Sequence, residues 1–168
     1  MIRFATPSPR QPSRETSMSE SPAFAVREQD VETLESPTSK LWLIADASDC
    51  CGVLGANRLR LETGAAGAKR HYHEKSSEAF YVLEGRLEMV IDNETRVVEK
   101  GGFVVIPPRT PHSFSATPDS FADVLVILVP GVDRFDYFRI LPNLLRGDMD
   151  KAEIEQIAAR YDVHVVDD

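Results

Sequence analysis

The chain has 168 residues, 27 of them acidic and 19 basic, which gives a formal net charge of −8 at pH 7. This length favours one domain with a sizeable hydrophobic core. The acidity argues against a nucleic-acid partner, because acidic surfaces repel phosphate backbones. No apolar run reaches membrane-spanning length, since the longest, residues 124–129, has the length of a buried strand.

Residues 1–22 contain four prolines and five serines. Such a composition does not bury enough apolar surface to fold alone, so we expect a disordered tail. Three arginines precede the first acid, Glu15, and this basic, serine-rich start is also typical of an organelle-targeting peptide. A third interpretation is an upstream extension of a protein that begins at Met18.

The next residues predict the first strands of a β-structure. Residues 23–36 are polar and acidic, and we expect them to follow the outside of the domain, with an edge strand through Ala25 and Val26. Residues 41–44 have the pattern of a strand. Residues 57–62 alternate polar and apolar side chains, as a half-buried strand does.

The chain has two cysteines, Cys50 and Cys51, and they are adjacent. A disulfide between neighbouring residues is strained, so we expect two free thiols. A reducing cytoplasm is therefore the expected location.

Three of the four histidines lie between Lys69 and Phe114. His71 and His73 are two residues apart, so on a strand both side chains point to the same face. Glu78 follows five residues later and reaches this face from a neighbouring strand, and His112 reaches it from a distant one. Three imidazoles and a carboxylate form a ligand set for a divalent metal ion. The alternative is a group of buried histidines that only satisfy hydrogen bonds.

These residues, in this order, resemble the two sequence motifs of the cupin superfamily. The first motif is His-x-His, four residues, Glu, six residues and Gly; the second is Gly, five residues, Pro, four residues and His. The matching positions are His71, His73, Glu78 and Gly85 in the first motif, and Gly101, Pro107 and His112 in the second. The sequence departs from the family pattern at Ala65, Arg109 and Ala116, none of which is a ligand position.

The resemblance covers about residues 40–130 and is closest to single-domain, quercetin dioxygenase-like cupins. It implies an all-β fold, an antiparallel double-stranded β-helix that forms a jelly-roll barrel. It also implies that one divalent metal ion (Fe, Ni, Mn, Co, Cu or Zn) is bound by His71, His73, Glu78 and His112.

Strand parity indicates which apolar residues accompany the ligands. Phe80 and Val82 share a face with Glu78, and Phe114 shares a face with His112. With Met89, they are expected to line a substrate-binding cavity, although the same residues serve equally as barrel core. Lys69 and Arg109 are candidates for holding an anionic substrate group, or are solvated surface charges.

Turn residues separate the later strands. We expect a turn at Gly85 and a hairpin at Asp92 and Asn93. Residues 103–106 and 122–129 predict buried strands, and the proline-rich residues 107–111 between them predict a rigid loop. Short strands with turns between them are typical of an antiparallel sandwich or barrel.

Residues 133–168 have a different character and predict a short helical extension. Asp133 is expected to cap a first helix that stops near Pro142. Asp150 and Glu153 resemble a capping box before a second helix, and residues 163–166 predict a final strand. The expected organisation is a tail over residues 1–22, a barrel over residues 23–132, and this extension packed on the barrel, where it caps one mouth or supports a dimer interface.

The resemblance implies an enzyme acting on a small aromatic or enolisable substrate, foremost a quercetinase-like dioxygenase. Glu78 then has a catalytic role, because the equivalent ligand of quercetin-cleaving cupins takes a proton from the substrate; a static ligand is the alternative. A second interpretation is a polyketide cyclase or isomerase that uses the metal as a Lewis acid. A third is a non-catalytic small-molecule-binding cupin. Family analogy predicts a homodimer.

Overall fold

The computed structural model of the protein describes residues 23–144 and 150–166. The predicted tail over residues 1–22 lies outside the described residues. The strands of the described chain are β1 (Thr33–Glu35), β2 (Ser39–Ala45), β3 (Gly55–Leu61), β4 (Ala66–Tyr72), β5 (Ser77–Ile91), β6 (Glu94–Glu99), β7 (Phe103–Ile106), β8 (His112–Ala116), β9 (Ala122–Val129) and β10 (His164–Val165). The helices are α1 (Phe135–Leu144) and α2 (Lys151–Arg160), with short 3-10 turns η1 (Glu28–Asp30) and η2 (Ala47–Cys50).

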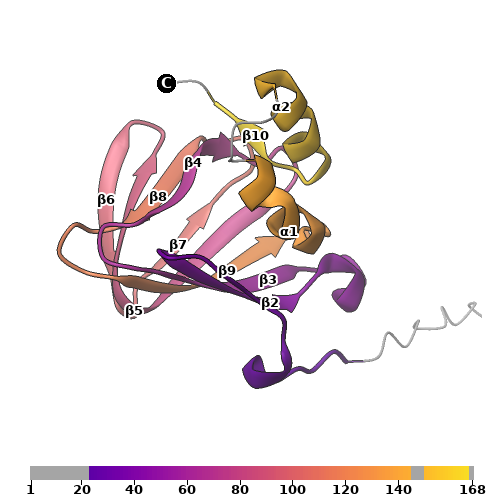
Figure 1. Cartoon of the computed structure of the whole chain (residues 1–168), viewed down its shortest axis with the longest axis horizontal. Helices are drawn as coiled ribbons and strands as arrows, with labels where there is room; N and C mark the ends of the chain where they lie inside the picture. The colour runs from indigo at the N-terminus through magenta and orange to yellow at the C-terminus, as the bar shows by residue number, and fades with distance from the viewer. Residues whose placement is uncertain (1–22, 145–149, 167–168) are drawn as a thin grey trace, which may run out of the picture.

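All strand pairs are antiparallel, and the strands follow the order β1-β2-β3-β9-β5-β8-β4-β10, with β6 and β7 also paired to β5. Figure 1 shows that the sheet curls round on itself, while the two helices lie together at one end, beside β4 and β10. The predicted all-β jelly-roll fold with a short helical extension is confirmed.

Strand β5 joins the two halves of the curled sheet. Its first half pairs with β7 and β9, and its second half pairs with β6 and β8. The register shifts between Val82 and Glu84, which is a β-bulge that bends the strand. The predicted turn at Gly85 is therefore wrong, because the strand continues through this residue.

Gly85 is required at the bend for two reasons. Its φ angle is +76°, a conformation that side chains with a Cβ rarely adopt. A Cβ at this position would also lie 2.0 Å from the carbonyl oxygen of Phe121. Because glycine has no Cβ, β5 can pass close to the backbone of Phe121, just before β9, at the point where β5 crosses from one half of the sheet to the other.

The inward faces of the strands form one hydrophobic core. Its fully buried members come mainly from β5 and β9, which lie at the centre of the sheet. They are Leu61, Phe80, Val82, Leu87, Met89, Ile106, Ala116, Ala122, Val124, Val126 and Leu128. A second, smaller core lies under the helical extension and is formed by Tyr137, Leu144, Ala158 and Val163.

Three local predictions differ from the structure. Ala25 and Val26 are not in a strand; the edge strand is β1, a few residues later. Residues 103–106 form the predicted strand, but Phe103 and Val105 are exposed, so this strand is not a buried one. The carboxylate of Asp133 accepts the amide N–H of Ser48, so it does not cap α1.

The N-terminus of α1 is capped by a residue distant in sequence. Asp46 Oδ1 accepts the amide N–H of Arg134 at 2.7 Å, and Asp46 Oδ2 accepts the amide N–H of Phe135 at 3.2 Å. These bonds satisfy donors that a helix start leaves free. By contrast, Asp150 caps α2 as predicted, since Oδ1 accepts the amide N–H of Ala152.

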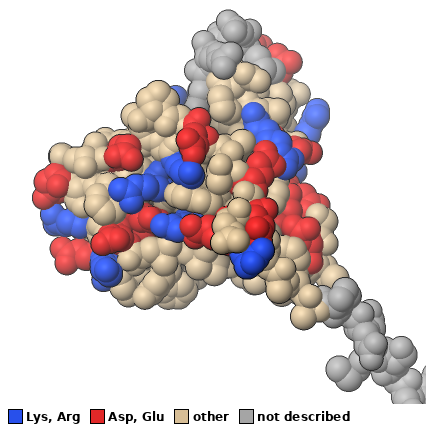
Figure 2. Space-filling model, turned by 60° about the horizontal axis from the view of Figure 1, so that its bottom comes forward, with Lys and Arg blue, Asp and Glu red and all other residues tan. Residues whose placement is uncertain are grey.

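The helices of the described residues are short, and one face of the molecule carries mixed charges. Neither α1 nor α2, nor any other helix of the described residues, has the length and apolarity needed to cross a bilayer. Acidic and basic side chains are interspersed over the face seen in Figure 2. Cys50 and Cys51 are free thiols, the second of them exposed.

Candidate metal centre

The structure brings the four predicted ligands together inside the barrel. His71 lies on β4 and pairs with His112 at the start of β8, while His73 follows β4 and Glu78 lies near the start of β5. One ligand atom from each residue lies within 4.8 Å of the others. Their exposed fractions are 5% or less, so the cluster is shielded from water.

Backbone carbonyl groups fix the orientation of all three imidazole rings. The Nδ1 atoms of His71, His73 and His112 lie 2.7, 2.5 and 3.0 Å from the carbonyl oxygens of Lys69, Asp162 and Thr110. A carbonyl oxygen only accepts hydrogen bonds, so Nδ1 carries the proton in each ring. The Nε2 lone pairs are then free to bind a metal, which is the usual arrangement of metal-ligating histidines.

The Nε2 atoms face a carboxylate oxygen instead of a donor. Those of His112 and His73 lie 2.9 and 3.2 Å from Glu78 Oε2. The second pair is not aligned for a hydrogen bond, which leaves His73 Nε2 buried without a partner. Burial, together with repulsion from the other two rings, lowers the pKa of His71 to about 3, so that ring is neutral. A divalent cation at the centre would satisfy these lone pairs, and the residues therefore fit such an ion.

Glu78 is ionised despite its burial. Burial alone would raise the pKa of its carboxyl group. The close contacts of its carboxylate with the His112 and His73 rings and the positive charge of Arg134 outweigh that effect and hold the pKa well below its ordinary value. The carboxylate is thus ready to bind a cation.

Two residues of the helical extension contact the cluster, and the sequence patterns point to neither. Arg134 precedes α1, and its Nη1 lies 3.4 Å from Glu78 Oε1. Asp162 follows α2, and its carbonyl oxygen accepts the Nδ1 proton of His73. Both residues are 9% exposed or less, and both lie far from the histidine motif in sequence.

Asp162 also fixes the loop between β4 and β5. Its carboxylate accepts the amide N–H groups of Glu74, Lys75 and Ser76 at 2.9–3.2 Å. Its φ angle is +59°, a left-handed conformation that aspartate tolerates better than most residues. One residue therefore anchors the extension, the loop after His73 and the His73 ring.

The residues predicted to line a substrate cavity lie mostly in the packed core. Phe80, Val82 and Met89 have no exposed surface. Phe114 is half-buried, with its ring centroid 5.1 Å from that of Phe80. Phe80 also contacts the edge of His112, at 6.3 Å between ring centroids. Phe80 thus brings an apolar ring against the histidine cluster.

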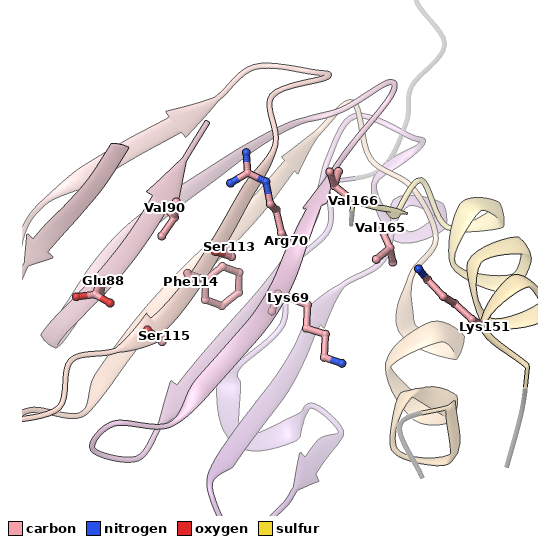
Figure 3. Close-up of a pocket in the computed structure, with 11 residues that line it drawn as sticks. Lys69, Arg70, Glu88, Val90, Ser113, Phe114, Ser115, Lys151, Val165 and Val166 are labelled. Carbon is pink, nitrogen blue, oxygen red and sulfur yellow. The ribbon is translucent and has the colours of Figure 1, made fainter. Parts of the chain in front are cut away.

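The basic candidates lie away from the cluster. A bulge in β4 between Ala68 and His71 interrupts the strand alternation, and Lys69 is exposed. It lines a groove of about 630 Å³ on the outer face of β4, β5 and β8, together with Arg70 and Glu88 (Figure 3). Arg109 is exposed and paired with Glu74.

His164 lies outside the cluster, as its position in the chain predicts. Its ring stacks on that of Tyr72, with 4.9 Å between centroids.

Comparison with known families agrees with this geometry. The family model described as "Cupin domain" matches residues 57–128, the segment that contains all four cluster residues. Residues 57–128 thus belong to the cupin superfamily. The resemblance seen in the two sequence motifs is therefore confirmed.

Three curated proteins are similar to parts of this cupin. It is 52% identical over 42 residues (25% of the chain, 34% of the relative) to an uncharacterized protein of Methanocaldococcus jannaschii. It is 33% identical over 92 residues (55% of the chain, 26% of the relative) to quercetin 2,3-dioxygenase of Bacillus subtilis. It is 38% identical over 60 residues (36% of the chain, 39% of the relative) to polyketide synthase CurC of Streptomyces cyaneus. The aligned segments thus span about a quarter to two fifths of these relatives.

Solved structures share the fold at low identity. One is a predicted oxalate decarboxylase of Thermotoga maritima, with 16% identity, a TM-score of 0.57, and coverage of 64% of this cupin and 99% of that chain. Another is the polyketide cyclase RemF of Streptomyces resistomycificus, with 22% identity, a TM-score of 0.53, and coverage of 70% and 93%. At this identity the likenesses show the fold alone.

Proposed function

We propose that this cupin is a metal-dependent dioxygenase that acts on a small aromatic or enolisable substrate. The observation that supports the proposal most is the buried cluster of three histidines and one glutamate, whose Nε2 lone pairs and carboxylate converge on one point. The similarity of residues within the barrel to a quercetin dioxygenase supports the choice of reaction.

In this proposal His71, His73, Glu78 and His112 hold one divalent ion. Such an ion would supply a binding position for a substrate oxygen and would activate dioxygen. Glu78 takes the proton of the substrate hydroxyl group as the enolate forms. Phe80, which packs against His112, and Phe114 beside it would help to exclude water from the reacting atoms.

A specific observation favours a second candidate, a non-oxidative cyclase or isomerase. The contacts of Glu78 with His112, His73 and Arg134 lower its pKa, which favours a fixed ligand over a base. In this case the metal acts only as a Lewis acid on a carbonyl group. Partial similarity to CurC and the fold shared with RemF are consistent with this candidate. A non-catalytic binding cupin is the third.

Oxygen consumption separates the candidates. With iron-, nickel- or manganese-loaded protein and quercetin or another flavonol, we expect dioxygen uptake equal to substrate loss. Glu78→Gln should lower the rate by about 100-fold or more, because it removes the base. Metal-free protein is the control. Conversion of substrate without oxygen uptake would reject the dioxygenase and support the cyclase or isomerase. Tight binding of substrate without turnover would support the non-catalytic binding cupin.

We also propose that two copies pair through the outer face of β5, β7 and β9. Tyr81, Phe103, Val105 and Val129 share this face and are 41–60% exposed, an unusual amount of apolar surface for an isolated chain. Gel filtration should then give about twice the chain mass of 18.7 kDa. An apparent mass equal to that of one chain would contradict the proposed dimer. The cytoplasmic location stays a prediction.

A further inference from the structure

Arg134 is a buried cation whose hydrogen-bonding capacity is mostly unused. Its exposed fraction is 9%. A guanidinium group has five N–H donors and stays charged at any physiological pH. Among the described residues, its side chain makes a single hydrogen bond, to Glu78 Oε1 at 3.4 Å, and its Nε is buried without a partner.

The neighbours of Arg134 hold it in place without using these donors. The guanidinium carbon lies 5.1 Å from the centroid of the Phe138 ring, a cation–π contact. Asp46 is close, but its two oxygens accept the amide N–H groups of Arg134 and Phe135. The space between these residues and Asn57 is about 10 Å³, enough for one water molecule at most. This space has no room for a larger ligand, whereas the guanidinium group also faces the carboxylate of Glu78.

The net charge of the metal-loaded site favours an anionic ligand beside Arg134. Without a metal, the negative charge of Glu78 balances that of Arg134. A divalent ion among neutral histidines leaves two positive charges in excess in a site from which water is excluded. Uncompensated buried charge is costly, so the loaded site favours anions over neutral molecules.

We propose that Arg134 binds an anionic oxygen of the substrate, a carboxylate or an enolate, next to the metal ligand Glu78. The inference rests on the proposed metal site and narrows its substrate class. The planar guanidinium group suits the purpose, because it binds carboxylate-like oxygens with fixed geometry. The extension thus supplies a binding residue that the barrel itself lacks.

Binding of formate to cobalt-loaded protein tests the proposal without any assay of activity. Formate is the smallest carboxylate, formamide is its neutral isostere, and the visible bands of cobalt(II) report a ligand that enters the site. We expect the wild-type protein to bind formate and not formamide. Arg134→Gln should weaken formate binding by about ten- to a hundred-fold, because one charge-assisted hydrogen bond is lost.

Arg139→Gln is the matched control, since Arg139 lies on α1 but is exposed and paired with Glu32 and Asp136. It should bind formate as the wild type does. If Arg134→Gln does not retain cobalt, Arg134→Lys is titrated, and weaker formate binding than in the wild type is expected.

Two results would overturn the role of Arg134: equal binding of formate and formamide, or formate binding by the cobalt-loaded variant at wild-type strength. Failure of the wild-type protein to take up cobalt would instead reject the proposed metal site.

Discussion

His112→Ala should reduce bound metal from about one ion per chain to less than about a tenth. His112 is 1% exposed, and its Nε2 faces Glu78, so its loss removes one of four ligands with nothing nearby to replace it. Loss even of a residue that only orients a ligand lowers metal affinity by about 10- to 100-fold, and loss of the ligand itself should cost at least as much. Elemental analysis after reconstitution and desalting measures the effect.

His164→Ala is the control for this variant. It removes an imidazole that stacks on Tyr72 and lies 3.7 Å from Asp162 Oδ1. Asp162 keeps its three bonds to amide N–H groups without this ring, so metal content should not change. His112→Gln keeps most of the side-chain volume and serves if the alanine variant does not fold. Unchanged metal content in a folded His112 variant would show that the ligand set is wrong.

Asp162→Ala should weaken both the fold and the metal site. The substitution leaves three amide N–H groups, of Glu74, Lys75 and Ser76, without their acceptor. We expect the free energy of unfolding of the metal-free protein to fall by about 3 kcal/mol. The backbone carbonyl of Asp162 also orients the His73 ring. Without the side-chain bonds, this carbonyl and the loop after His73 are no longer held together, so zinc affinity should fall by at least about tenfold.

Two measurements separate these effects. Urea denaturation in the presence of a chelator gives the change in stability, and zinc competition with a chromophoric chelator gives the change in affinity. Asp162→Asn keeps a side-chain oxygen and tolerates the left-handed backbone, so its effects should be much smaller. If Asp162→Ala matches the wild type in both measurements, the extension does not support the metal site.

The parts of the site that depend on short sequence patterns could be predicted from the sequence. The spacing of His71, His73 and Glu78, with a stiff loop before His112, predicts that the four side chains meet inside the barrel, and the structure brings them together. The hairpin at Asp92 and Asn93 also follows from its turn residues, and the structure has it. Periodicity and turn chemistry act within a few residues, which is why they are readable in a single sequence.

The remaining features depend on contacts that a local pattern does not contain. Arg134 reaches Glu78 across 56 positions, and Asp162 reaches His73 across 89. Gly85 has the positive φ angle that is typical of a turn, but it lies inside β5 and pairs with Ala122 of β9. Only this long-range pairing shows that the strand continues.

The sequence did not decide whether Phe80 and Met89 belong to the core or line a cavity, because both positions require a side chain that points into the barrel. The structure places both in the core against the histidine cluster.

The metal content of the purified protein tests the central claim most directly. The protein is analysed by elemental analysis as isolated and after anaerobic reconstitution with iron, nickel, manganese, cobalt, copper and zinc in turn. Three inward Nε2 lone pairs and one ionised carboxylate predict about one tightly held divalent ion per chain. Folded protein that retains no ion under any of these conditions would contradict the account.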